Sequence, residues 1–211
     1  MVQIHPSLLA LDFSKLSPLL AAIKSADYLH IDIMDGHFVP NHTFGPHILQ
    51  TVKKLSKLPF EIHLLVTNPL DHIDTYLPFS SRFIIHAESD NPEKAIKKIH
   101  SEHGEAGIAI NPDTPIETII PFLKKADFIC MMSVHPGFSG QSFLRSTIAR
   151  LAMLRRLMED KQLELPILLD GGITPELISQ LAADNYVVGN SLFFDNKPDA
   201  IAKRLYTMKS L

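Results

Sequence analysis

The sequence predicts a single α/β domain that folds as a (β/α)8 barrel (TIM barrel), with parallel strands inside and helices outside. Along the 211 residues, short apolar runs alternate with longer amphipathic stretches, and this alternation is typical of parallel strands joined by helices. The strand-like runs recur about every 26 residues between His5 and Val187, so eight strand–helix units fit the length. No linker divides residues 1–211. A doubly wound open sheet is the alternative architecture.

Eight apolar runs are the expected strands. They are rich in β-branched and aromatic residues, which favour strands, and turn-forming residues lie between them. In chain order they are QIHPSLL (3–9), DYLHIDI (27–33), FEIHLLV (60–66), RFIIHAE (82–88), AGIAIN (106–111), DFICMMSV (127–134), PILLD (166–170) and YVVG (186–189).

Six amphipathic stretches between these runs are the expected helices. In the stretch 143–161 apolar residues recur at spacings of three and four, the period of a helix face that packs on a core. This stripe consists of Leu144, Ile148, Leu151, Leu154 and Met158. The six stretches are 17–25, 45–57, 91–103, 114–125, 143–161 and 198–210.

Composition and charge exclude several classes of protein. Hydrophobic residues make up 45% and charged residues 20% of the chain, as in ordinary soluble globular proteins. A formal net charge of -3 offers no basic surface for nucleic acid. No apolar run is long enough for a bilayer and no signal-peptide pattern opens the chain, so no membrane partner is expected. The single cysteine, Cys130, fits a buried inert thiol in a cytoplasmic protein.

Two histidines and two aspartates are the candidate metal ligands. His30 and Asp32 lie two residues apart in a strand and therefore share one face with Met34. His63 and Asp170 belong to other strands, and polar groups of such barrels gather at the carboxyl ends of the strands. This donor set suits one divalent metal ion, which could be zinc, iron, manganese or cobalt. A hydrogen-bonded network inside the barrel is the alternative.

Glycine-rich loops follow the last three expected strands. They are HPGFSGQ (135–141), DGGI (170–173) and GNS (189–191). Glycine lets backbone amides approach an anion closely, and the loops after strands seven and eight of such barrels often hold a phosphate. None of the three loops contains lysine or arginine, so amides and helix N-termini are expected to bind it. Plain turn formation is the alternative reason for the glycines.

Five longer motifs occur in a fixed order between Ile4 and about Phe193. They are HPSLLALDF, HIDIMDGHFVPNHTFGP, EIHLLVTNP, HPGFSGQSF and DGGIT. In this order they resemble the ribulose-phosphate 3-epimerase family, whose members have a (β/α)8 barrel of the ribulose-phosphate-binding type. The resemblance implies an isomerase that interconverts D-ribulose 5-phosphate and D-xylulose 5-phosphate in the pentose phosphate pathway. It also implies one bound divalent metal ion, a small sugar phosphate as the partner, and a homo-oligomer.

The resemblance also assigns residue roles by motif position. It makes His30, Asp32, His63 and Asp170 the metal ligands, and Asp32 and Asp170 the two acid–base residues. Epimerisation at C3 removes a proton next to the C2 ketone and returns one to the opposite face, which requires a carboxylate on each side of a flat enediolate and a cation on its oxygens. The expected substrate contacts are Ser7, Met34, His63, Gly137, Phe138, Ser139, Gly140, Gly171, Gly172, Gly189, Asn190 and Ser191.

Several positions depart from the family pattern and leave other functions open. Leu65 stands where the family usually has methionine, and Asn190 stands where a phosphate-contacting serine is usual, with Ser191 one place later. VGNSLF is somewhat like the loop of allulose-6-phosphate 3-epimerase, which is the alternative enzyme. DGGI and the FGP after His42 favour the pentose enzyme. A catalytically inactive sugar-phosphate-binding barrel is the third possibility, and the presence of all four metal-site residues argues against it.

Overall fold

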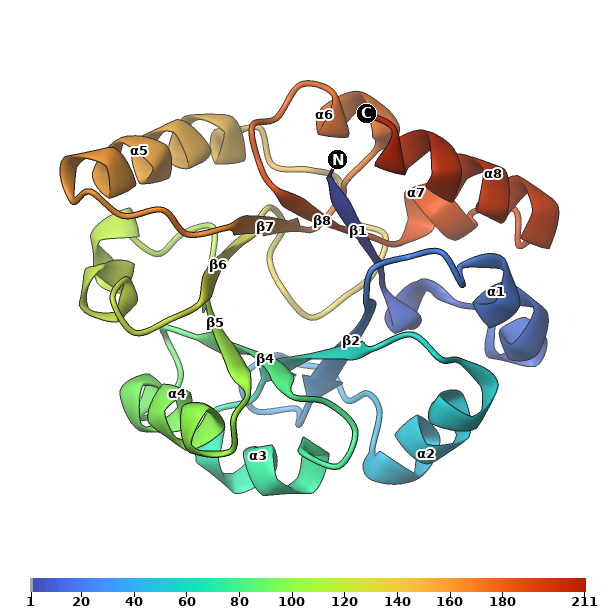
Figure 1. Ribbon diagram of the computed structural model, residues 1–211, viewed down its shortest axis with the longest axis horizontal. Helices are drawn as coiled ribbons and strands as arrows, with labels where there is room; N and C mark the ends of the chain where they lie inside the picture. Colours follow the sequence, from blue (N-terminus) through green and yellow to red (C-terminus); the bar gives the residue numbers. More distant parts are fainter. Residues whose placement is uncertain (1) are drawn as a thin grey trace.

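Eight parallel strands form a barrel in residues 2–211, which the computed structural model describes (Figure 1). They are β1 (Gln3–Pro6), β2 (Leu29–Met34), β3 (Phe60–Leu65), β4 (Arg82–His86), β5 (Glu105–Ile110), β6 (Phe128–Met132), β7 (Ile167–Asp170) and β8 (Asn185–Val188). Their order in the sheet is β1-β8-β7-β6-β5-β4-β3-β2. β1 and β2 meet at an isolated parallel bridge between Ser7 and His30, which closes the ring. The predicted (β/α)8 barrel is confirmed.

Helices surround these strands (Figure 1). They are α1 (Leu16–Ala22), α2 (Pro46–Leu55), α3 (Leu70–Tyr76), α4 (Pro92–Ser101), α5 (Ser146–Asp160), α6 (Pro175–Ile178), α7 (Asn190–Phe193) and α8 (Pro198–Lys209). The last helix packs beside the first, where Lys209 Nζ donates to the Asp27 carboxylate and to the Ser25 carbonyl. Within residues 2–211, no helix combines the length and the apolar character that crossing a membrane requires.

Two expected elements differ from the structure for reasons that lie in the backbone. The strand expected at 3–9 ends at Pro6, because the Ser7 hydroxyl accepts a hydrogen bond from the Leu9 amide and starts a short 3-10 helix. The helix expected at 114–125 is instead a 3-10 helix, η3 (Ile116–Phe122), with Pro121 inside it. Proline has no N–H to donate and its ring crowds the preceding turn, so a regular α-helix is disfavoured there.

The buried face of α5 also differs from the predicted stripe. Leu151, Leu154 and Met158 are buried as expected, but Ile148 is 51% exposed. Thr147 takes its place on the buried face at 1% exposure. The helix begins at Ser146, and the residue of its first turn that faces the core is Thr147. Thr147 is polar, so the apolar pattern does not include it.

Alternation along the strands separates two buried layers. Leu29, Ile31 and Ile33 point outward into the large core between the strands and the helices. His30 and Asp32 lie on the opposite face, as predicted from the strand period. The interior of the barrel is filled by a separate apolar cluster of Ile84, Ala109, Phe128, Cys130, Met132, Leu168 and Val187. Burial there raises the pKa of the Cys130 thiol well above its usual value, which keeps it inert.

Candidate active site

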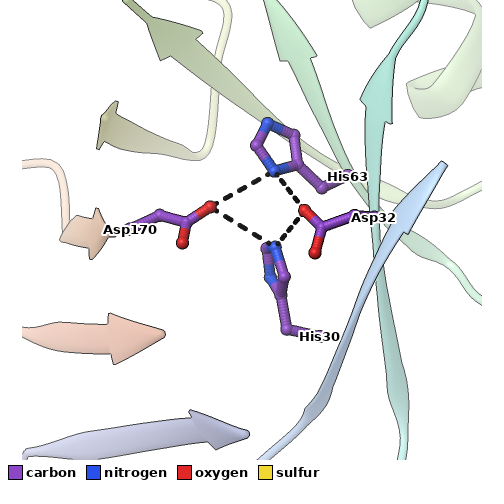
Figure 2. Close-up of side chains that lie close together, drawn as sticks. All are labelled: His30, Asp32, His63 and Asp170. Carbon is purple, nitrogen blue, oxygen red and sulfur yellow. Dashed lines mark hydrogen bonds and ion pairs between the residues drawn. The ribbon is translucent and has the colours of Figure 1, made fainter. Parts of the chain in front are cut away.

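Four side chains from three strands meet near the carboxyl ends of the strands. His30 and Asp32 come from β2, His63 from β3 and Asp170 from the last position of β7. One ligand atom from each lies within 4.8 Å of the others. Asp32 Oδ1 lies 3.3 Å from both His30 Nε2 and His63 Nδ1, and Asp170 Oδ2 lies 3.6 Å and 3.4 Å from the same two nitrogens. Figure 2 shows the four side chains directed at one common centre.

Burial divides these four residues into two pairs. The side chains of His30 and His63 are 0% exposed, whereas those of Asp32 and Asp170 are 10% and 13% exposed. The imidazoles therefore lie beneath the floor of the site and the carboxylates reach the space above it.

A buried carboxylate orients His30 from below. Glu61 Oε1 lies 2.9 Å from His30 Nδ1 and 2.9 Å from His5 Nδ1, and its other oxygen accepts from Arg82 Nε at 2.7 Å. A histidine that donates Nδ1–H to a carboxylate presents its Nε2 lone pair to the other side. Sequence reasoning missed Glu61, although the two-residue spacing to His63 in EIH places both on the interior face of β3.

The arrangement fits a divalent cation. His63 Nδ1 is fully buried and faces two carboxylate oxygens, yet it makes no hydrogen bond of acceptable geometry within the described chain. A buried polar atom without a partner is costly. Two imidazole nitrogens and two carboxylate oxygens are suitable donors for zinc and for related transition metals, so these residues could hold such an ion.

The pKa values show which charge the cluster favours. Burial by itself lowers the pKa of His30, but the Asp32 carboxylate and the hydrogen bond with Glu61 raise it well above 6.5. His63 is similarly desolvated, and its pKa is raised by Asp170 and Asp32. In the opposite direction, burial of Asp32 works to raise its pKa, and the two histidines overcome this and lower it. The cluster therefore stabilises positive charge at its centre, as a proton or as a metal ion.

A cavity of about 510 Å³ opens directly above the two aspartates. Its apolar wall includes Leu65, at the position where the family usually has methionine, together with Leu9 and Met132, which sequence reasoning did not assign to the site. Among the described residues that line it, there is no lysine or arginine. His63 lies below the cavity and does not line it. The other expected substrate contacts do line it: Ser7, Met34, Gly137, Phe138, Ser139, Gly140, Gly171, Gly172, Gly189, Asn190 and Ser191.

Two of the cavity glycines are required by the backbone. Gly171 and Gly172 have φ values of +121° and +65°, a region that glycine adopts more easily than other residues. A Cβ at Gly172 would lie 2.4 Å from the Phe143 amide nitrogen. Turn geometry therefore accounts for these two glycines whether or not an anion binds beside them.

The loop after β8 presents free amides to the same cavity. Asn190 and Ser191 open α7, and their amides have no backbone acceptor in the part of the chain that the structure describes. The side chains are engaged: the Ser191 hydroxyl donates to the Ile173 carbonyl at 2.6 Å, and Asn190 Oδ1 accepts from the Ser139 hydroxyl at 3.2 Å. The backbone donors are thus more available to a ligand than the Ser191 hydroxyl.

Solved structures of other enzymes share this fold. A mutant tryptophan synthase alpha-subunit from Pyrococcus furiosus matches with a TM-score of 0.71 and 13% identity, covering 100% of both chains. Phosphoribosyl anthranilate isomerase from Thermococcus kodakaraensis matches with a TM-score of 0.69 and 12% identity, covering 100% of this chain and 98% of that one. At such low identity these matches show the fold alone.

Sequence comparison identifies the family. The model of the ribulose-phosphate 3 epimerase family matches residues 3–194. Ribulose-phosphate 3-epimerase from Mycobacterium bovis is 34% identical over 207 residues, covering 96% of this chain and 90% of that protein. The Helicobacter pylori enzyme of the same name is 35% identical over 95% of this chain and 94% of that protein. The chloroplastic ribulose-5-phosphate-3-epimerase of Arabidopsis thaliana is 32% identical over 90% of this chain and 71% of that protein. The chain therefore belongs to the ribulose-phosphate 3-epimerase family and is an epimerase.

Proposed function

We propose that this epimerase interconverts D-ribulose 5-phosphate and D-xylulose 5-phosphate. In this proposal Asp32 and Asp170 are the two acid–base residues. One divalent metal ion is held by His30, Asp32, His63 and Asp170. The observation that carries this proposal is the placement of the two carboxylates, which face each other above two buried imidazoles at the floor of one cavity. Membership of the family supports the same reaction and the same substrates.

The two aspartates approach from opposite sides of the barrel. Asp32 belongs to β2 and Asp170 to β7, and the two side chains point toward each other in Figure 2. One carboxylate can therefore remove the C3 proton from one face of a flat intermediate while the other returns a proton to the opposite face. When bound, the metal ion would polarise the C2 ketone and make the C3 proton more acidic. The Ser7 hydroxyl donates to Asp32 Oδ2 at 3.2 Å and holds that carboxylate in place.

The apolar wall of the cavity protects the reacting carbon from water. Met34 and Leu65 pack with Val39 in a small buried cluster, and Met132 lines the cavity from β6. These side chains carry no group that can exchange protons, so the proton at C3 comes from one of the two aspartates. Leu65 keeps the wall apolar at the position where the family usually has methionine.

The phosphate group is proposed to bind at the glycine loops on the far side of the cavity. The amides of Gly171, Gly172 and Gly189 and those at the start of α7 would donate to its oxygens. The absence of lysine and arginine from the described cavity lining supports this mode, because the backbone then supplies the available positive dipoles.

A direct assay tests the proposal. The purified chain is stripped of metal with a chelator, reloaded with Zn²⁺, Fe²⁺, Mn²⁺ or Co²⁺, and assayed with D-ribulose 5-phosphate and with D-allulose 6-phosphate. We expect metal-dependent inversion at C3, with kcat/KM for the pentose at least about tenfold above that for the hexose, a difference of about 1.4 kcal/mol. A higher value for the hexose would identify the allulose-6-phosphate enzyme. Binding without turnover of either sugar would identify an inactive sugar-phosphate-binding barrel.

A further inference from the structure

The second ring nitrogen of His63 contacts another buried histidine. His63 Nε2 lies 2.9 Å from Nε2 of His86, the last residue of β4, and the planes of the two rings are 7° apart. Both residues are completely buried. At this separation two N–H groups would clash and two lone pairs would repel each other. A single proton therefore lies between the rings, donated by one nitrogen and accepted by the other.

The partner of the other His86 nitrogen sets the direction of this hydrogen bond. His86 Nδ1 lies 3.3 Å from Glu88 Oε2, and Glu88 Oε1 accepts the Asn111 amide at 2.8 Å. An ionised carboxylate only accepts hydrogen bonds, so the proton of a neutral His86 is on Nδ1 and its Nε2 is a lone pair. His63 is then the donor through Nε2–H, and its Nδ1 carries the lone pair that faces Asp32 and Asp170.

We propose that His86 and Glu88 are positioning residues that hold His63 in its metal-binding tautomer, through the hydrogen-bonded chain His63–His86–Glu88. This inference rests on the proposed function, because it takes His63 as a metal ligand. These hydrogen bonds fix the tautomer of His63, as the hydrogen bond with Glu61 does directly for His30. It differs in that a neutral imidazole is inserted between the ligand and the carboxylate. The centre of the Phe38 ring lies 4.8 Å from the centre of the His86 ring, and this contact helps to shield the His63–His86–Glu88 hydrogen bonds from water.

Two substitutions of His86 separate hydrogen bonding from packing. His86→Leu removes the acceptor for His63, whereas His86→Gln supplies an amide oxygen that can accept the same proton and an NH₂ that can donate to Glu88. We expect His86→Leu to weaken Zn²⁺ binding roughly 10- to 100-fold, measured by competition with a chelating dye, and His86→Gln to stay within about threefold of the unsubstituted protein. His100→Leu is the matched control, because it breaks another histidine–carboxylate pair, with Asp127, at an exposed position. It should leave zinc affinity unchanged.

A spectroscopic measurement tests the tautomer without any substitution. In zinc-loaded protein with ¹⁵N-labelled histidine, His63 should carry its proton on Nε2 and show a scalar coupling across the N–H···N hydrogen bond to His86 Nε2. The coupling should vanish in His86→Leu. A His63 proton on Nδ1 in the zinc-loaded protein would overturn the proposal even if His86→Leu did not fold. Zinc affinity of a folded His86→Leu within about threefold of the unsubstituted protein would also overturn it.

One further variant distinguishes this inference from the function on which it rests. His63→Ala should lose zinc if His63 is a ligand. If His63→Ala bound Zn²⁺ as tightly as the unsubstituted protein, the metal site of the proposed function would be wrong. If it lost zinc while His86→Leu kept it, only the role of His86 and Glu88 would be wrong.

Discussion

Asp32 and Asp170 face the same cavity from different surroundings. Asp32 accepts a hydrogen bond from the Ser7 hydroxyl, and the two buried histidines lower its pKa. Asp170 is the last residue of β7, it lies 3.6 Å and 3.4 Å from nitrogens of His30 and His63, and it lines the same cavity. The two proposed bases come from different strands, β2 and β7, so each can be tested alone.

Replacing either aspartate by asparagine should remove one base and keep the shape of the site. We expect Asp32→Asn and Asp170→Asn each to lower the rate of epimerisation by roughly 10²- to 10⁴-fold, the usual contribution of a positioned acid–base group. Each variant should still exchange the C3 proton of one epimer with solvent, and the two variants should differ in which epimer exchanges. Incubation of each variant with each epimer in heavy water, read at C3 by NMR, gives the answer. Near-normal interconversion by either variant would rule out the two-base mechanism.

Arg145 provides a test of how the phosphate is bound. It lies in the loop before α5, it is exposed, and it is not among the residues that line the cavity. If backbone amides hold the phosphate, Arg145→Ala should change KM by less than about twofold in a steady-state assay. A tenfold rise in KM, equivalent to about 1.4 kcal/mol, would show that a cationic side chain had been overlooked.

At the scale of the elements, β5 and β6 share a tightly filled position inside the barrel. Gly107 on β5 pairs in register with Phe128 on β6. A Cβ at Gly107 would lie 2.4 Å from the Phe128 ring, and the Arg82 guanidinium lies 3.8 Å above the centre of the same ring. The phenyl ring therefore occupies the space that a larger residue at 107 would need.

Gly107→Ala should overpack this position. We expect the free energy of unfolding to fall by about 1–3 kcal/mol, the usual cost of an extra methyl group in a filled core, as measured by urea denaturation. Gly45→Ala is the control, because a Cβ there would meet nothing within 4 Å. Its effect should stay below about 1 kcal/mol, since it changes only the residue before α2. Equal losses from the two substitutions would contradict the packing argument.

The elements that the sequence predicts are those with a long repeating pattern. Each expected strand overlaps an observed one, because buried parallel strands are continuous apolar runs. The helices α6 and α7 are four residues long, about one turn each, so they contain too few turns to show a helical period. The stretch 114–125 has the apolar spacing of a helix face, but Pro121 lies within it and the structure there is the 3-10 helix η3.

The site was predictable to the extent that its residues lie on strands. The strand period and the barrel topology are enough to bring His30, Asp32, His63 and Asp170 to one end of the barrel. Their hydrogen-bond partners could not be assigned in the same way. Glu61 and His86 act across neighbouring strands, so their roles depend on the register of β2, β3 and β4, which the apolar pattern alone does not specify.

At the scale of the whole molecule, a connected network of charged and titratable side chains lies inside the barrel. Below the proposed metal ligands lie Glu61, His5 and Arg82, and Arg82 also pairs with Glu105 at the edge of this interior network. Burial works to raise the pKa of Glu61, but the two histidines beside it hold that pKa well below its usual value. The pKa of His30, one of these two histidines, is raised, so its protonation is linked to folding, and this linkage makes the effect of a metal depend on pH.

Zinc should stabilise the protein more at alkaline pH than at acid pH. In the metal-free protein the pKa values of His30 and His63 are raised above 6.5. Their protonation therefore contributes stability that is fully present below about pH 6.5 and is lost as the pH rises through the folded-state values. Zinc binds only unprotonated imidazoles. Protons therefore compete with zinc for these nitrogens at low pH, whereas at high pH the nitrogens are free to bind zinc. Thermal unfolding with and without one equivalent of Zn²⁺ should give a larger rise in Tm at about pH 8.5 than at about pH 6.

The control for this prediction is His63→Ala, which should lose most of the rise in Tm at both pH values. In the unsubstituted protein, a rise in Tm at about pH 6 that equals or exceeds the rise at about pH 8.5 would contradict the linkage.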